Sequence, residues 1–223
     1  MKETVELFFT KSLEEKMNKN ILFYSFCENE SEKYIEELLE IPLSDFVRYM
    51  DTIADKQQIE SRDVFQFSNL DNATHNFCGK MKEKNNPGMK FIEIGKLLLD
   101  DGIVRKDGAL TKYGENHAKT AEMLGLAFEL CNTYYLSCIG YTYTTLSEEK
   151  QQKLLTRLIL RNKLIMRLYQ ASHNGKVDMR NFLYMISDST YIRRRSNIKR
   201  ILNILTKSNE YEFSEFIDRI YYD

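Results

Sequence analysis

The sequence TYIRRRSNIKRILNILT, residues 190–206, decides the fold of the C-terminal half of the chain. Apolar residues recur in it at the spacing of one helical face, so a single helix is predicted over the whole stretch. The apolar stripe consists of Tyr191, Ile198, Ile201, Leu202 and Leu205. A short helix over residues 179–186 and a break at Ser187-Asp188 are predicted before it. A short helix, a break and a longer helix form the order of a helix-turn-helix unit.

The face opposite the apolar stripe is basic and polar. In a helix-turn-helix unit the second helix enters the major groove of DNA, and its first turns reach the base edges. Arginine suits guanine and asparagine suits adenine, so Arg193, Asn197 and Arg200 are the predicted base contacts. The predicted phosphate contacts are Ser189, Thr190, Arg194, Arg195 and Lys199. The alternative is that these arginines pair with acidic residues near the N-terminus.

The Lys and Arg residues are concentrated in one segment. The chain of 223 residues has a net charge of −1, but residues 147–207 hold 14 Lys and Arg against 4 Asp and Glu. Residues 1–60 hold 7 against 14, residues 61–146 hold 10 against 10, and residues 208–223 hold 1 against 5. A basic block between acidic ends is typical of a polyanion-binding module, because Lys and Arg release counterions from phosphate. A solvated helix surface is the alternative.

A second helical unit is predicted upstream, over residues 69–123. Two helices, over residues 71–84 and 89–99, are followed by an apolar pair and then by Lys106-Asp107-Gly108. Asp-Gly supplies the positive φ angles of a two-residue turn, so a tight hairpin is predicted there. With a further helix beginning at Thr111, this is the order of a winged-helix unit. Lys106, at the tip of the wing, is a further predicted DNA contact, and a hairpin without a ligand is the alternative.

Residues 124–141, LGLAFELCNTYYLSCIGY, carry a single charge, at Glu129. Such an apolar run predicts a buried central helix on which two halves pack, or a self-association surface that favours a homodimer. We therefore expect a mostly α fold with tandem helix-turn-helix units, the first winged, around a central apolar helix. The predicted regions are an acidic helical region (1–68), the winged-helix-like unit (69–123), the central helix (124–144), the basic helix-turn-helix unit (145–207) and an acidic segment (208–223).

Three strings in these units resemble a known family. DSTYIRRRSNIKRIL, residues 188–202, is similar to the Ser-Thr and basic cluster of winged-helix modules attached to bacterial type II restriction endonucleases and related defence proteins. Leu110-Thr111-Lys112-Tyr113-Gly114 resembles their exit from the wing, and residues 99–104 resemble their helix-to-strand step. The chain departs from these modules in having no Trp. The resemblance covers residues 70–206 and implies a DNA-binding role in bacterial restriction, phage defence or transcription control.

The sequence shows no catalytic constellation. It has no phosphate-binding glycine loop or nucleophile motif, and its two Glu-x-Lys strings, at residues 14–16 and 148–150, lie in predicted helices rather than in strands of a nuclease. The isolated histidines are His75, His117 and His173. The four Cys lack CxxC spacing, so we expect reduced, mostly buried thiols, no metal site and no cofactor.

Two classes of function remain. The first is a non-catalytic protein that binds double-stranded DNA, and the second is a helical adaptor that recruits a partner protein, or a second copy, through its acidic N-terminal region. The basic block favours the first. The sequence has no uncharged apolar run of about 18 residues, so it predicts no membrane span. Acidic residues interrupt the N-terminal apolar stretch, which is not typical of a signal peptide. We therefore expect a cytoplasmic protein.

Overall fold

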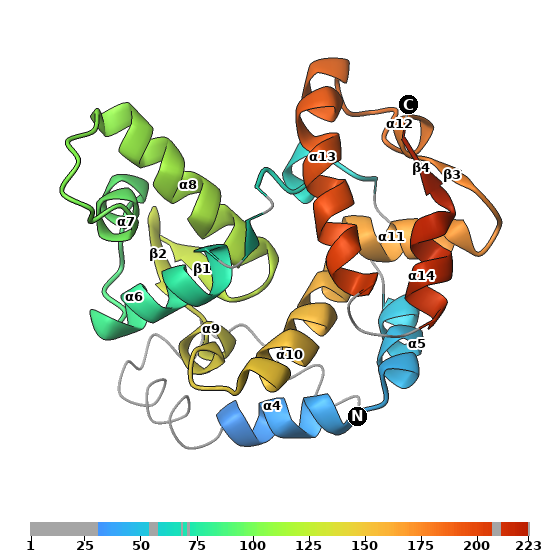
Figure 1. The fold of residues 1–223 in the computed structure, drawn as a ribbon, viewed down its shortest axis with the longest axis horizontal. Coiled ribbons are helices and arrows are strands. Elements are labelled where there is room, and N and C mark those ends of the chain that lie inside the picture. Colours follow the sequence, from blue (N-terminus) through green and yellow to red (C-terminus); the bar gives the residue numbers. More distant parts are fainter. Residues whose placement is uncertain (1–30, 54–57, 68, 71, 207–210, 223) are drawn as a thin grey trace. The chain divides into compact units, whose positions relative to one another are not determined.

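The computed structural model describes residues 31–53, 58–67, 69–70, 72–206 and 211–222, and these are mostly helical (Figure 1). The chain divides into two compact units, each assembled from two stretches of sequence. The first unit consists of residues 1–41 and 69–151, and the second consists of residues 42–68 and 152–223. The helices and acidic residues predicted within positions 1–30 lie outside the described residues, and so does Cys27. No helix in the described part of the chain combines the length and apolar character that a bilayer crossing requires.

The first unit combines helices with one small hairpin. Its elements are α4 (Ser31–Glu40), the π-helix η2 (Asn72–Asn76), α6 (Phe77–Glu83), α7 (Phe91–Leu98), α8 (Asp107–Met123), β1 (Ala127–Leu130), β2 (Thr133–Leu136) and α9 (Cys138–Tyr143). The helix α10 (Glu148–Arg161) begins in this unit and continues in the second. Local capping defines two helix starts, because the Glu93 carboxylate accepts the Lys90 N–H at 2.7 Å and the Ser137 hydroxyl accepts the Gly140 N–H at 3.1 Å.

Two glycines bring α7 and α8 into close contact. A Cβ on Gly95 would lie 2.0 Å from the Leu110 carbonyl oxygen, and a Cβ on Gly114 would lie 1.9 Å from the Phe91 carbonyl oxygen. Each helix therefore packs on the backbone of the other, and only the absence of a side chain permits this approach. In Figure 1, α8 lies beside both α7 and the hairpin.

The predicted central helix over residues 124–141 is wrong, because this stretch contains the antiparallel hairpin of β1 and β2. Cys131 and Asn132 form the two-residue turn with φ angles of 51° and 60°, the left-handed conformation that such a tight turn requires. In β2, buried Tyr134 and Leu136 alternate with half-buried neighbours, which is the two-residue period of a strand. The apolar composition of residues 124–141 predicts a helix, but the buried residues of β2 recur at the two-residue period of a strand.

The predicted hairpin around Asp107-Gly108 is also wrong. Residue Asp107 begins α8, with Lys106 at its N-cap, so the pair forms the first helical turn instead of a β-turn. A negative side chain in that turn is favoured by the helix dipole. The apolar residues before it, Ile103 and Val104, belong to no strand, and Val104 is 98% exposed. The small hairpin therefore follows the long helix and does not precede it.

In its described residues, the second unit combines helices with one pair of two-residue strands. Its elements are α5 (Leu43–Ile53), the 3-10 helix η1 (Ser61–Asp63), α11 (Lys163–Ser172), β3 (Val177–Asp178), α12 (Met179–Phe182), α13 (Asp188–Leu205), α14 (Tyr211–Asp218) and β4 (Ile220–Tyr221), together with most of α10. Strands β3 and β4 pair in parallel. The Asn162 side chain caps α11 by accepting the Leu164 and Ile165 N–H groups at 3.0 and 3.3 Å. Phe46, Phe65 and Phe213 are among its fully buried side chains.

The cysteines differ from the expectation of reduced thiols. Cys78 is a free buried thiol and Cys131 is a free exposed one, but Cys138 is disulfide-bonded. Burial raises the pKa of the Cys78 thiol, so it remains protonated and unreactive at neutral pH. Of the three isolated histidines, His117 is fully buried in α8, where its Nδ1 lies 2.8 Å from the Tyr113 carbonyl oxygen.

Candidate nucleic-acid interface

The predicted helix over residues 190–206 is confirmed as α13, and its buried face is the predicted stripe of Tyr191, Ile198, Ile201, Leu202 and Leu205. The opposite face is exposed. Its residues are Ile192, Arg193, Ser196, Lys199, Arg200 and Asn203. Within the described residues, no ion pair is found for Arg193, Lys199 or Arg200. The outer face of α13 therefore carries three cations with no carboxylate partner in the described part of the chain.

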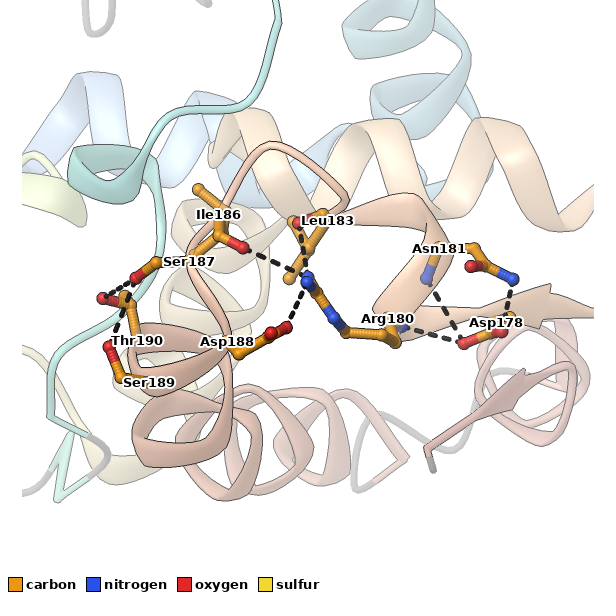
Figure 2. A network of polar contacts seen from close by, with 9 residues as sticks. All are labelled: Asp178, Arg180, Asn181, Leu183, Ile186, Ser187, Asp188, Ser189 and Thr190. Carbon is orange, nitrogen blue, oxygen red and sulfur yellow. Dashed lines mark hydrogen bonds and ion pairs between the residues drawn. The ribbon is translucent and has the colours of Figure 1, made fainter.

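A polar network holds the turn between α12 and α13 (Figure 2). The Arg180 guanidinium donates hydrogen bonds to the carbonyl oxygens of Leu183 and Ile186, at 3.2 and 3.1 Å, and forms an ion pair with Asp188. The Asp178 carboxylate caps α12 by accepting the Arg180 N–H at 2.8 Å and the Asn181 side-chain amide at 2.6 Å. One arginine thus satisfies the carbonyls of the turn and the first acid of α13, which sets the direction in which α13 leaves the turn.

Hydroxyl groups surround the first turn of α13. The Ser187 hydroxyl donates to the Thr190 hydroxyl at 3.0 Å and lies 3.4 Å from that of Ser189 (Figure 2). The Arg193 side chain folds back over them, donating from Nε to the Ser189 carbonyl oxygen at 3.0 Å and from Nη2 to the Thr190 hydroxyl at 3.3 Å. Three predicted contacts, Ser189, Thr190 and Arg193, therefore gather at the N-terminal end of α13.

Two other predicted contacts face the protein instead of solvent. They hold residues 58–67, which we name the strap. Arg194 donates from Nη1 to the carbonyl oxygens of Ser61 and Val64, the latter at 3.1 Å, and Asn197 donates its amide to the Gln66 carbonyl oxygen at 2.9 Å. Burial, and then the charge of Arg193, lower the pKa of Arg194. These side chains therefore donate to backbone carbonyls of the strap and do not face solvent.

The remaining predicted contacts, Arg195, Lys199 and Lys106, lie in three different surroundings. Arg195 is half-buried at the side of α13, and Lys199 is exposed with its Nζ 5.8 Å from the centre of the Tyr222 ring. Lys106 is exposed at the N-cap of α8, in the other unit. The structure therefore brings Ser189, Thr190, Arg193, Lys199 and Arg200 together on one helix and assigns Arg194 and Asn197 to contacts within the unit.

Sequence reasoning missed an exposed apolar pair in the turn before α13. Tyr184 and Met185 are 68% and 58% exposed, between the two carbonyls that Arg180 binds. The Gln58 side-chain amide donates to the Tyr184 hydroxyl at 3.1 Å, so the strap also contacts this ring. Their signal in the sequence is the apolar string FLYMI, residues 182–186, which lies inside the short helix predicted over residues 179–186.

Two other polar clusters were considered as sites. In the first unit, the Tyr134 hydroxyl donates to the Glu129 carboxylate at 2.9 Å and lies 3.4 Å from that of Glu122. Burial, and then the nearby Glu129 charge, raise the pKa of Glu122. In the second unit, a half-open cavity of about 290 Å³ is lined by residues that include Ser172, Glu215 and Arg219. The Arg219 guanidinium of this cavity already binds the Ser172 carbonyl oxygen and the Glu215 carboxylate, so it is not directed at an anionic ligand.

The described residues contain no group of three or more His, Cys, Asp and Glu side chains arranged to hold a metal ion. Comparison of the chain with protein families, with curated proteins and with solved structures gives no match. The arguments for function therefore rest on the geometry of α13 and its surroundings.

Proposed function

We propose that the protein binds double-stranded DNA through the outer face of α13, without catalysing a reaction on it. The observation that carries this proposal is the set of three exposed cations, Arg193, Lys199 and Arg200, on a face whose acid, Asp188 in the first turn, is already paired with Arg180. Cations that lack an ion pair remain available to replace the counterions of a phosphate backbone, and arginine also recognises guanine. The resemblance to winged-helix modules of bacterial restriction and defence proteins favours a regulatory or targeting role in that setting, or in transcription control.

The order of elements in the second unit supports this proposal, and the order in the first unit fits a related fold. In the second unit, α12, the turn held by Arg180 and the 18-residue helix α13 follow the order of a helix-turn-helix, in which the second helix enters the major groove. In the first unit, α6, α7 and α8 precede the hairpin, and Met89 pairs with Tyr134 as a third, one-residue strand. Three helices followed by a hairpin fit a winged-helix unit whose wing is β1 and β2.

The two units differ in their charge. The residues of the second unit hold 17 Lys and Arg against 12 Asp and Glu, whereas those of the first hold 15 against 21. The exposed residues of α8 mix both signs, with Asp107 and Lys112 in its first two turns. DNA repels an acidic surface, so we assign DNA binding to the second unit and not to the first.

A gel-shift titration of a generic 20-base-pair duplex at two salt concentrations tests the proposal. We expect the wild-type affinity to fall as salt rises, and Lys199→Ala to reduce the slope of log K against log salt by about 1. Lys176→Ala removes the same charge from an exposed position of this unit outside α13, so it serves as the matched control with an unchanged slope. On a specific site, Arg200→Ala should cost about 1–3 kcal/mol. Binding that is absent, or independent of salt, would contradict the proposal.

The loop before α8 favours a second candidate function, that of a protein adaptor. Arg105 forms a bidentate ion pair with Asp101, with both N–O distances at 2.6 Å, and Asp101 also accepts the Ile103 N–H at 3.1 Å. This clamp presents Ile103 and Val104, which are 63% and 98% exposed. Apolar side chains held outward suit a protein partner. Under this reading Val104→Asp abolishes capture of the partner, and no salt-dependent DNA binding is found.

A further inference from the structure

The turn between α12 and α13 presents apolar side chains at the end of a basic face. Tyr184 and Met185 are held in it between the carbonyls of Leu183 and Ile186, both of which accept hydrogen bonds from Arg180 (Figure 2). Ile192, 60% exposed, lies on the outer face of α13 next to Arg193. Because Arg180 binds the carbonyls on both sides of the turn, it holds the backbone in the conformation that exposes Tyr184 and Met185.

The Tyr184 ring is also fixed from a second direction. Gln58, in the strap, donates to its hydroxyl at 3.1 Å, and the strap is itself bound by Arg194 and Asn197 of α13. A Tyr ring restrained in this way loses little conformational entropy when another surface covers it. Exposed single apolar residues are ordinary, but a restrained aromatic ring followed by an exposed Met185, directly before a helix that carries three exposed cations, is a more specific surface.

The neighbouring charges identify what this surface fits. A purely apolar partner would leave Arg193 and Arg200 without compensation, whereas DNA offers anionic phosphates for the cations and thymine methyl groups, base faces and sugars for the apolar side chains. The chain order places the apolar turn directly before the first turn of α13, which is the part of a recognition helix that reaches the base edges.

We propose that Tyr184 and Met185 form an apolar contact with the bases and sugars of a DNA duplex, next to the phosphate contacts of α13. This inference rests on the proposed function and adds a contact of a different chemical kind. An apolar contact releases no counterion from DNA, so its removal lowers the affinity at every salt concentration by the same factor. Removal of a cation, by contrast, lowers the affinity and the salt slope together.

Duplex titrations with the full-length protein, followed by fluorescence anisotropy at several salt concentrations, test this inference. We expect Tyr184→Ala to weaken binding about tenfold, equivalent to about 1.4 kcal/mol, with the salt slope of the wild type. Tyr184→Phe retains the ring but loses the hydroxyl bound by Gln58, so it should lose much less affinity than Tyr184→Ala. Tyr221→Ala is the matched control, because Tyr221 is an exposed Tyr of the same unit, in β4, and should leave binding unchanged.

The outcomes separate this inference from the proposed function. Salt-dependent wild-type binding together with unchanged affinity in Tyr184→Ala would overturn the inference alone. So would an equal loss in Tyr221→Ala, or a loss in Tyr184→Ala accompanied by a lower slope. If Tyr184→Ala left the affinity unchanged but dissociated an oligomer in light scattering, the surface would belong to a contact between copies and the inference would be overturned. Absence of salt-dependent binding in the wild type would contradict the proposed function itself.

Discussion

At the scale of single residues, the structure separates arginines that share one sequence cluster. Arg193 is exposed on the outer face of α13, whereas Arg194 lies toward the strap and donates to its backbone carbonyls. Successive residues of a helix point about 100° apart, so neighbouring cations with the same chemistry have different partners. Their substitution should therefore affect different properties of the protein.

Asn197→Ala is expected to lower stability and leave DNA affinity unchanged. It removes the donor to the Gln66 carbonyl oxygen and leaves that half-buried acceptor without its partner, which costs about 1–2 kcal/mol of the free energy of unfolding. Urea denaturation followed by circular dichroism measures this loss. Asn203→Ala is the control on the exposed face of the same helix, with no change in stability. Unchanged stability in Asn197→Ala, with weaker binding, would restore Asn197 as a base contact.

The Asp101–Arg105 clamp predicts a pH dependence in the first unit. The hydrogen bonds from Arg105, followed by that from the Ile103 N–H, lower the pKa of Asp101 from 3.8 to about 2. Folding therefore favours the ionised carboxylate, so this contribution to stability is present above the unfolded pKa and is lost as the pH falls through about 2. Carboxyl NMR titration measures the pKa directly. In Arg105→Gln it should return toward 3.8, and a pKa that stayed near 2 would assign the shift to the backbone.

At the scale of elements, the packing of α7 on α8 depends on glycine. Gly114→Ala places a Cβ 1.9 Å from the Phe91 carbonyl oxygen, so the helices must separate, and we expect a loss of about 1–3 kcal/mol in the free energy of unfolding. Gly108→Ala is the matched control in the same helix, where a Cβ meets no atom within 4 Å. It should stabilise the protein by up to about 1 kcal/mol. Thermal unfolding measures both variants. A shift of the two melting temperatures in the same direction would contradict the close packing of α7 on α8.

Sequence patterns were sufficient to predict some of the helices but not the position of the hairpin. The 3.6-residue period of α13 and the caps of the neighbouring helices predicted a long basic helix after a short one, and both are present. The hairpin was misplaced because two signals conflicted: Asp107-Gly108 suits a tight turn and also a first helical turn, whereas Cys131-Asn132 has no strong turn signal. Tertiary contacts decided between them, because Tyr134 pairs with Met89 and its side chain is buried in the first unit.

At the scale of the whole molecule, basic residues that form one block in the sequence pair with acidic residues in the folded chain. Residues 152–207 of the basic segment share a unit with the acidic residues of 42–68, and Asp63 of the strap forms an ion pair with Lys163 at 3.4 Å. Arg180 is likewise paired, with Asp188. Many of the 14 cations in the segment are therefore engaged within the protein.

The salt dependence of DNA binding should reflect the exposed cations and not the composition. If Arg193, Lys199 and Arg200 all contact phosphate, the slope of log K against log salt is about −2.7, because each contact contributes about −0.9. Contacts by all 14 Lys and Arg of residues 147–207 would give a slope near −13. Titration between 50 and 200 mM salt, as rough bounds, separates these values. A slope steeper than about −5 would show that cations outside the face of α13 take part.

The argument for a homodimer from the apolar stretch does not hold in the structure. It depended on apolar side chains of residues 124–141, but Leu126 and Tyr134 are buried within the first unit, and Phe128 stacks on Tyr135 across the hairpin with ring centres 5.7 Å apart. These side chains form the core and face of a hairpin, so they do not supply the large apolar surface on which the dimer was predicted.

The sequence by itself determined the helix that carries the proposed interface, because the apolar stripe and the caps act over a few residues and are visible in the local pattern. It also determined that the outward side of this helix is basic. Only the tertiary structure decided which cations remain available, because the partners of Arg194 and Asn197 belong to a strap about 130 residues earlier in the chain. Local periodicity sets which residues share a helix face, but long-range packing sets what covers that face.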